Sequence, residues 1–124
     1  MAVILTVDDS PTIRKIIVAT LESVGHEVHE AMEGSMALES AKTKRYDLVL
    51  IDYYLPDTNG MELVKSIRAL ADYQEVPLVI LTTEGSDIAK QDKESPVTAW
   101  MMKPFDPDEL VNTVNKLLES GHAN

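Results

Sequence analysis

Five short runs of mainly apolar residues recur along this chain, and longer segments with helical spacing separate them. Four of the runs are apolar or β-branched over most of their length, whereas the second alternates apolar with polar residues. They are Val3–Val7, Glu27–Ala31, Leu48–Asp52, Pro77–Thr82 and Thr98–Lys103. Continuous apolar runs are typical of strands buried on both faces, and alternation is typical of an edge strand. The pattern therefore predicts an α/β fold, a (βα)5 doubly wound domain with one parallel five-stranded sheet.

Helix signals fill the segments between these runs. Ser10 followed by Pro11 is typical of an N-cap and a first helical position, and Gly25 is a typical helix stop. Further helices are predicted over about 35–44, 60–71, 86–94 and 106–121. We expect most Leu, Ile and Val side chains to form the core, together with three methionines and the apolar stripe of the first helix. These are Met61, Met101, Met102, Ile13, Ile16, Ile17, Leu21 and Val24.

Size and charge exclude several classes of protein. With 124 residues, the chain has room for one domain over 1–124 and none for an effector domain. The net charge of −10 disfavours binding to nucleic acids and anionic membranes. The absence of cysteine excludes disulfides, thiolate metal sites and cysteine nucleophiles. No signal peptide or apolar segment of about 20 residues is present, so we expect a cytoplasmic location.

Polar residues stand where four of the five predicted strands end. Asp8 and Asp9 follow the first strand, and Asp52, Thr82 and Lys103 end the third, fourth and fifth. Ligands of open parallel sheets bind beside the carboxyl ends of the strands. Two carboxylates about 4 Å apart repel by on the order of 4 kcal/mol at an effective dielectric of about 20. Because Lys103 offsets one of three charges, the set predicts a divalent cation site that suits Mg²⁺, although each acid alone would also fit a helix cap or a solvated turn.

Ordered landmarks along nearly the whole chain resemble the receiver domain of two-component response regulators. They are the Asp8-Asp9 pair, the D-x-x-x-P segment from Asp52 to Pro56, Gly60, Thr82 and the K-P-F segment from Lys103 to Phe105. The segments VDDSPTIRK and LTTE…W…KPF are most similar to single-domain chemotaxis regulators of the CheY type. The resemblance implies the flavodoxin-like strand order 2-1-3-4-5.

The resemblance also implies a phosphoacceptor and a metal site. Asp52 would take a phosphoryl group from a phosphohistidine on a partner histidine kinase, of the CheA type in chemotaxis. Mg²⁺, with Mn²⁺ as a substitute, would be held by Asp9, Asp52 and the backbone carbonyl of Tyr54. Asp8 would reach the cation directly or through water.

Further roles are implied at the last two strands. Lys103 would pair with the transferred phosphoryl group, and the Thr82 hydroxyl would donate a hydrogen bond to it. The Lys103–Pro104 peptide is expected to be cis. Trp100 stands where relatives carry a Tyr or Phe that turns inward on activation, so Thr82 and Trp100 form the expected switch. A surface aromatic packed on the helix over 86–94 is the alternative for Trp100.

Two side chains depart from the family pattern beside the expected path of the attacking water. Tyr54 lies two residues after Asp52, and Glu84 lies two residues after Thr82. We expect both positions to tune dephosphorylation, and the large phenol of Tyr54 to slow it. Pro96 occupies the place of a helix-ending glycine, so the helix over 86–94 is expected to be short or irregular.

Basic residues outside the acidic cluster are interpreted as surface residues. Arg14, Lys15 and Arg68 are assigned to solvated faces, with the first two near enough to the acids to contact a kinase. The three histidines, His26, His29 and His122, form no set with the spacing of metal ligands.

The function expected from the resemblance is a monomeric phosphorylation switch that catalyses its own phosphorylation and dephosphorylation. Its partners would be a histidine kinase, a downstream protein such as the flagellar motor switch, and a phosphatase. The output face would combine the helix over 86–94, the last strand and the last helix. A phosphate sink or relay in another two-component pathway has the same chemistry, and the sequence leaves both open.

Three other classes fit the sequence less well. A haloacid-dehalogenase-like, magnesium-dependent aspartyl-phosphate phosphatase needs a second acid two residues after its nucleophile, where Tyr54 stands. A flavodoxin-like cofactor module would have its phosphate repelled by Asp8 and Asp9. A P-loop nucleotide-binding domain would need the GxxxxGK[ST] motif, which the chain lacks.

Overall fold

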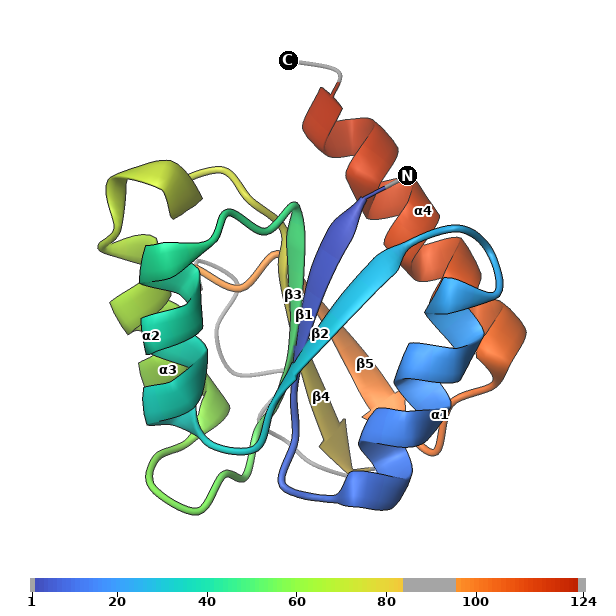
Figure 1. Ribbon diagram of the computed structural model, residues 1–124, viewed down its shortest axis with the longest axis horizontal. Coiled ribbons are helices and arrows are strands. Elements are labelled where there is room, and N and C mark those ends of the chain that lie inside the picture. Colours follow the sequence, from blue (N-terminus) through green and yellow to red (C-terminus); the bar gives the residue numbers. More distant parts are fainter. Residues whose placement is uncertain (1, 84–95, 123–124) are drawn as a thin grey trace.

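The computed structural model describes residues 2–83 and 96–122, and its five strands form one parallel sheet (Figure 1). The strands are β1 (Val3–Val7), β2 (Glu27–Ala31), β3 (Leu48–Asp52), β4 (Leu78–Thr83) and β5 (Ala99–Lys103). Their order is β2-β1-β3-β4-β5, as the family resemblance implies, and the alternating strand β2 lies at an edge. The predicted strands are therefore confirmed, with shifts of one residue at the ends of β4 and at the start of β5.

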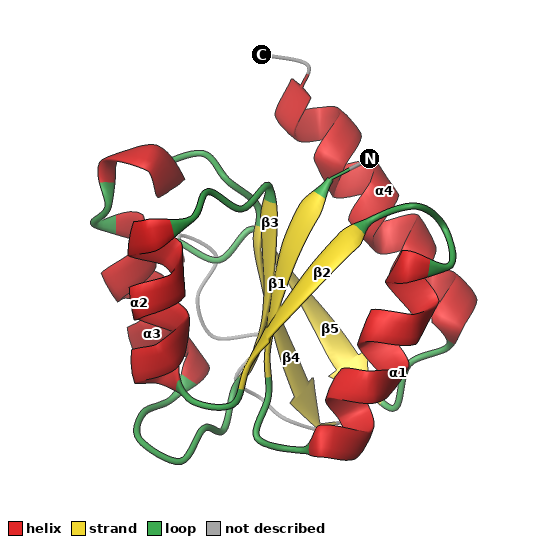
Figure 2. Ribbon diagram, viewed as in Figure 1, coloured by secondary structure: helices red, strands yellow, loops and turns green. Residues whose placement is uncertain are grey.

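Helices cover both faces of the sheet. They are α1 (Pro11–Glu22), α2 (Gly34–Thr43), α3 (Gly60–Arg68), the 3₁₀ helix η1 (Ala71–Tyr73) and α4 (Pro107–His122). Figure 2 shows α1 and α4 on one side of the strands and α2 and α3 on the other. The helix predicted over 86–94 lies outside the described residues. None of the described helices is long and apolar enough to cross a membrane.

The core consists of two apolar layers, one on each face of the sheet. Successive strand residues point to opposite faces, so that in β3 Leu50 packs under α1 and α4 whereas Ile51 packs under α2 and α3. Both side chains are fully buried. Burial on both faces explains why the strands are nearly continuous apolar runs.

Three residues assigned to the core from the sequence are instead exposed. Ile16, Val24 and Met102 expose 45%, 46% and 42% of their surface. The buried face of α1 follows Ile17 and Leu21, which leaves Ile16 to one side, and Val24 lies after the end of the helix. Met102 points to the opposite face of edge strand β5 from its buried neighbour Met101.

The ends of α1 form as the sequence predicts. The Ser10 hydroxyl accepts a hydrogen bond from the Ile13 backbone N–H at 3.3 Å, and Pro11 occupies the first helical position. Gly25 turns the chain back with a φ of 95°, in the left-handed region that glycine favours. Helix α4, by contrast, continues past its predicted stop at Gly121 as far as His122.

Helix α2 is capped by a residue from another loop. Glu33, its own N-cap residue, makes no side-chain capping bond. Instead the Asp57 carboxylate, from the loop between β3 and α3, accepts hydrogen bonds from the backbone N–H groups of Gly34 at 2.8 Å and Ser35 at 2.9 Å. These N–H groups, that of Gly34 most strongly, hold the pKa of Asp57 below its ordinary value of 3.8.

Replacing Asp57 with alanine is expected to lower the melting temperature at neutral pH, because α2 loses its cap. A lowered pKa means that folding favours the ionised carboxylate. Its stabilising effect is present above the ordinary pKa of 3.8 and is lost as the pH falls through the lower folded-state value. Thermal unfolding followed by circular dichroism should therefore show a gap between wild type and variant that narrows below this pH. A gap that stays constant down to acid pH would contradict the role of the ionised cap.

Arg68 does not lie on a solvated face, as the sequence suggested, but holds two loops together. Its guanidinium, at the end of α3, donates hydrogen bonds to the carbonyl oxygens of Tyr73 at 2.7 Å, Val76 at 2.6 Å and Pro96 at 3.0 Å. It also donates to the Thr98 hydroxyl at 2.9 Å. Burial lowers the pKa of Arg68, and the acceptors replace the water that the guanidinium gives up. The segments that lead into β4 and β5 are thus joined through one side chain.

Candidate functional site

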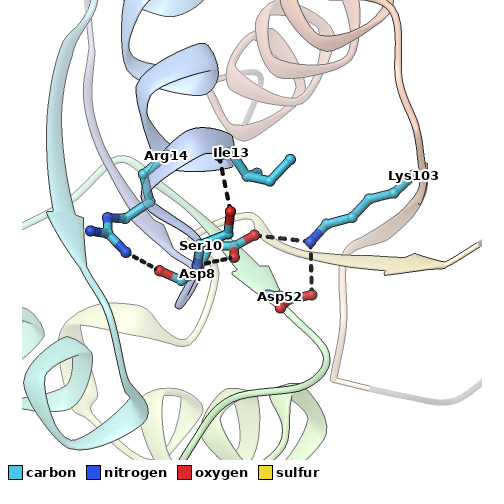
Figure 3. A network of polar contacts seen from close by, with 6 residues as sticks. All are labelled: Asp8, Ser10, Ile13, Arg14, Asp52 and Lys103. Carbon is cyan, nitrogen blue, oxygen red and sulfur yellow. Dashed lines mark hydrogen bonds and ion pairs between the residues drawn. The ribbon is translucent and has the colours of Figure 1, made fainter.

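The carboxyl ends of three strands bring two acids and a lysine into direct contact. Asp8 follows β1, Asp52 ends β3 and Lys103 ends β5. Figure 3 shows the Lys103 ammonium between the two carboxylates, 2.9 Å from Asp8 Oδ2 and 3.0 Å from Asp52 Oδ1. The parallel strands end at one edge of the sheet, so residues 95 and 51 positions apart in sequence meet there.

Asp9 completes a cluster of three carboxylates. One oxygen each from Asp8, Asp9 and Asp52 lies within 4.8 Å of the others. Asp8 is 1% exposed and Asp52 8%, whereas Asp9 lies open to solvent. Within residues 2–83 and 96–122, Lys103 is the only cation that forms an ion pair with any of them. The cluster thus carries two more negative than positive charges when all its members are ionised.

Burial and neighbouring charges both shift the pKa values of Asp52 and Lys103. Burial raises the pKa of Asp52, the hydrogen bond from Lys103 opposes this effect, and the charges of Asp8 and Asp9 reinforce it. Burial by itself would lower the pKa of Lys103, but its bonds to Asp8 and Asp52 outweigh burial and raise it. The surplus negative charge and the all-oxygen donor set fit a hard divalent cation such as Mg²⁺.

Asp8 is held in place by the start of α1 and by β2. Its Oδ1 accepts the Ser10 backbone N–H at 2.9 Å, and its own backbone N–H donates to the Ala31 carbonyl at 3.1 Å. Arg14 donates to the Asp8 carbonyl oxygen at 2.6 Å and to Glu30 at 3.0 Å. The Arg14 side chain is only 13% exposed, so its assignment to a solvated face is wrong, although its expected place near the acids is confirmed.

The start of α3 packs closely against the backbone of Asp52 and Tyr53. The Gly60 N–H donates to the Tyr53 carbonyl at 2.6 Å. A Cβ on Gly60 would lie 3.0 Å from the Asp52 carbonyl oxygen and 3.0 Å from Tyr53 Cα, so a side chain would force the loop to shift. Tyr54 is 60% exposed, and its ring meets Tyr53 edge to face with 4.9 Å between centroids. The large phenol thus stands at the surface two residues from Asp52.

Thr82 and Trp100 lie on the neighbouring strands β4 and β5. Thr82 is 1% exposed, and its hydroxyl has no hydrogen-bond partner in the described part of the chain. Trp100 pairs with Ile80 across the ladder and packs, partly buried, against the core layer under α2 and α3. The predicted cis peptide between Lys103 and Pro104 is present. Glu84, and the helix that was the alternative contact for Trp100, fall outside the described residues.

Strand order, the acid cluster and the lysine at the end of β5 together define a receiver domain. The family profile described as the response regulator receiver domain matches residues 4–115, and the chain belongs to this family.

Chemotaxis regulators are among its similar relatives. The chemotaxis protein CheY homolog of Campylobacter jejuni is 36% identical over 122 residues, which cover 95% of this chain and 93% of the homolog. The structure of the chemotaxis response regulator CheY4 of Vibrio cholerae has a TM-score of 0.88 and 38% identity, covering 94% of this chain and 98% of CheY4.

Receivers from other systems are also similar. The receiver domain of the sensor histidine kinase PA1611 from Pseudomonas aeruginosa has a TM-score of 0.87 and 29% identity over 95% of this chain and 98% of its own. That structure holds a magnesium ion coordinated in its active site cleft. The transcriptional regulatory protein SrrA of Staphylococcus aureus is 34% identical over 93% of this chain but only 47% of its own length.

Proposed function

We propose that this chain is a phosphorylation switch in which Asp52 accepts a phosphoryl group from a histidine kinase. The observation that carries the proposal is the contact of Lys103 with both Asp8 and Asp52 at the strand ends. Lys103 is placed to neutralise charge on a group bonded to Asp52. Thr82 contributes a buried hydroxyl with no partner among the described residues, so it can donate to a phosphoryl oxygen.

Phosphoryl transfer asks for positioning and charge neutralisation more than for acid–base groups. In this mechanism an Asp52 carboxylate oxygen forms the new P–O bond while the P–N bond to the donor histidine breaks. The bonding electron pair leaves with the imidazole nitrogen. Lys103 releases its hydrogen bond to Asp52 and follows the negative charge onto the phosphoryl oxygens. Hydrolysis of the acyl phosphate, in which water attacks phosphorus and the bond to the Asp52 oxygen breaks, would regenerate the Asp52 carboxylate and release inorganic phosphate.

The cation belongs to the same proposal. Asp9, Asp52 and the Tyr54 carbonyl would hold Mg²⁺, with Asp8 bound directly or through water, and Mn²⁺ would suit the same oxygens. When bound, the cation supplies charge neutralisation for the phosphoryl group. The support is the set of three carboxylate oxygens within 4.8 Å of one another, together with the magnesium ion in the related PA1611 receiver.

The direct test uses acetyl phosphate as a phosphoryl donor with Mg²⁺. The wild-type protein should form an acid-stable, hydroxylamine-sensitive acyl phosphate that intact mass spectrometry detects. A protein that stays unlabelled under saturating donor and Mg²⁺ would contradict the proposed function.

Activation is proposed to couple Thr82 to Trp100. As Thr82 moves toward the phosphoryl group, it would vacate space that the partly buried indole then enters. We expect Mg²⁺ with beryllofluoride, which mimics a phosphoryl group, to shift the Trp100 emission to shorter wavelength. Trp100 is the only tryptophan, so the tryptophan emission can be assigned to this side chain. An unchanged spectrum at saturating mimic would count against the switch.

Replacing Tyr54 with asparagine is expected to speed loss of the phosphoryl group, because the exposed phenol borders the approach of water to Asp52. Decay of the acyl phosphate after removal of acetyl phosphate measures this rate. Phenylalanine at the same position serves as the matched control and should keep the slow decay, since it preserves the bulk of the ring. An equal or slower decay in the asparagine variant would refute the role of Tyr54, and Glu84 is proposed to tune the same step.

Chemotaxis is the proposed pathway, with a kinase of the CheA type and the flagellar motor switch as target. The support is similarity to proteins named as chemotaxis regulators over nearly their full length. Binding to a motor-switch protein that requires beryllofluoride would favour this pathway. Rapid phosphotransfer from a kinase without such binding would favour a phosphate sink or relay instead.

A further inference from the structure

The loop between β3 and α3 is attached to α2 through one carboxylate. Asp57 accepts hydrogen bonds from the first two N–H groups of α2, those of Gly34 at 2.8 Å and Ser35 at 2.9 Å. The helix has no side-chain cap of its own, because Glu33 makes no such bond. Two segments that lie 23 residues apart in sequence thus depend on Asp57 for their polar contact.

Close packing reinforces this attachment. A Cβ built on Gly34 would lie 2.5 Å from the Thr58 methyl group and 3.3 Å from Asp57 Oδ1. Glycine at this position therefore lets the loop lie directly against the first turn of α2. We therefore expect the loop and the first turn of α2 to move together.

Asp57 and Tyr54 belong to the same short turn. The Leu55 N–H donates to the Thr58 carbonyl at 3.2 Å, and Tyr54 pairs with Asn59 in an isolated antiparallel bridge. Asn59 then caps α3 by accepting the Glu62 N–H at 2.9 Å. Asn59 thus attaches the end of the turn to α3, and Asp57 attaches the turn to α2. The position of the Tyr54 backbone therefore depends on both helices.

We propose that Asp57 is a positioning residue for the cation site, and that through it cation binding is transmitted to the first turn of α2. This inference rests on the proposed function, in which the Tyr54 carbonyl is a metal ligand. Groups that orient metal ligands are typically worth tenfold or more in metal affinity. Coupling is reciprocal, so a loop that α2 holds in place must in turn hold α2 more firmly when the cation is bound.

The experiment compares Mg²⁺ binding by the wild type and Asp57→Ala in the full chain. Isothermal titration calorimetry gives the affinity, and amide resonances of Gly34 and Ser35 in ¹⁵N-labelled protein report the first turn of α2. We expect the affinity of Asp57→Ala to fall about tenfold. The Gly34 and Ser35 resonances should shift with Mg²⁺ in the wild type and stay nearly constant in the variant.

Glu33→Gln is the matched control, because it removes one negative charge beside Gly34 and leaves the Asp57 bonds intact. Its affinity should stay within about twofold of wild type, as expected for an exposed charge. Asp57→Asn keeps one carbonyl acceptor and should give an intermediate affinity. It also serves if the alanine variant fails to fold by circular dichroism.

Two outcomes separate the inference from the proposed function. If the wild type binds Mg²⁺ and Asp57→Ala and Asp57→Asn bind it equally well, the positioning role is wrong while the cation site stands. If the wild type binds no Mg²⁺, the proposed cation site fails and the positioning role fails with it. A loss of affinity as large in Glu33→Gln as in Asp57→Ala would also overturn the inference, since charge alone would then explain it.

Discussion

Replacing Asp52 with asparagine is expected to abolish labelling by acetyl phosphate and Mg²⁺, a loss of more than about a hundredfold. The amide oxygen of asparagine has nearly the shape of the carboxylate oxygen but lacks the charge that makes it a nucleophile. No other carboxylate among the described residues contacts Lys103 except Asp8, which the N-cap turn of α1 holds in place. Intact mass spectrometry of the wild type and the variant measures the outcome.

The Asp52→Asn variant should remain folded, because ionised Asp52 opposes folding when no divalent cation is bound. Burial raises its pKa above the ordinary 3.8, so the stability of the wild type falls as the pH rises from that value through the raised one. Asparagine removes this effect, and the melting temperature at neutral pH should equal or exceed that of the wild type. Asp72→Asn, an exposed acid in η1, is the control and should label normally. Full labelling of Asp52→Asn would show that another residue is the acceptor.

Replacing Lys103 with methionine is expected to cost about 2 kcal/mol of the free energy of unfolding at neutral pH. Removing one partner of a buried ion pair costs about 3–5 kcal/mol, and partial exposure of this pair reduces the effect. The Lys103 side chain is 18% exposed, and those of Asp8 and Asp52 are 1% and 11%. Methionine keeps the length of the stem but leaves two carboxylates facing each other without a cation. Urea unfolding at pH 7 measures the loss.

Added Mg²⁺ should restore much of this stability, because it supplies the missing positive charge. Labelling by acetyl phosphate should nevertheless stay low, since the phosphoryl oxygens have lost their ammonium partner. Lys65→Met is the matched control: its ion pair with Glu62 spans 3.5 Å, and both side chains are about 60% exposed. Exposed pairs contribute about 0.2–1 kcal/mol. A Lys103 variant no less stable than the Lys65 variant would contradict the structural role of the cluster.

The strands and the acid cluster could be predicted from the sequence because both follow local patterns. Runs such as Leu48–Ile51 are apolar without interruption, and parallel strands bring their ends to one edge, so Asp8, Asp52 and Lys103 could be placed together from the sequence. Each of these residues could be recognised from the few residues beside it in the sequence. The cis peptide at Pro104 was expected from family resemblance rather than from the residues.

The contacts of Asp57, Arg68 and Arg14 could not be predicted in this way. Asp57 caps a helix that starts 23 residues earlier, and Arg68 reaches carbonyl groups as far as 28 residues away. No periodicity relates such pairs, because backbone acceptors and donors carry no mark in the sequence. Exposure of Ile16 and Met102 was missed for a related reason, since spacing alone does not say which side of an apolar stripe meets the sheet.

The contact between Lys103 and Asp8 has a consequence for synthesis on the ribosome. The two residues are 95 positions apart, so the lysine emerges only after the first four strands have been made. Until then Asp8 and Asp52 lack their counter-charge, and closing the sheet around them would bury two like charges. Early closure of the sheet is therefore less favourable by the cost of burying this uncompensated pair. We therefore expect the sheet to reach its full stability only when the last strand brings Lys103 to the two acids.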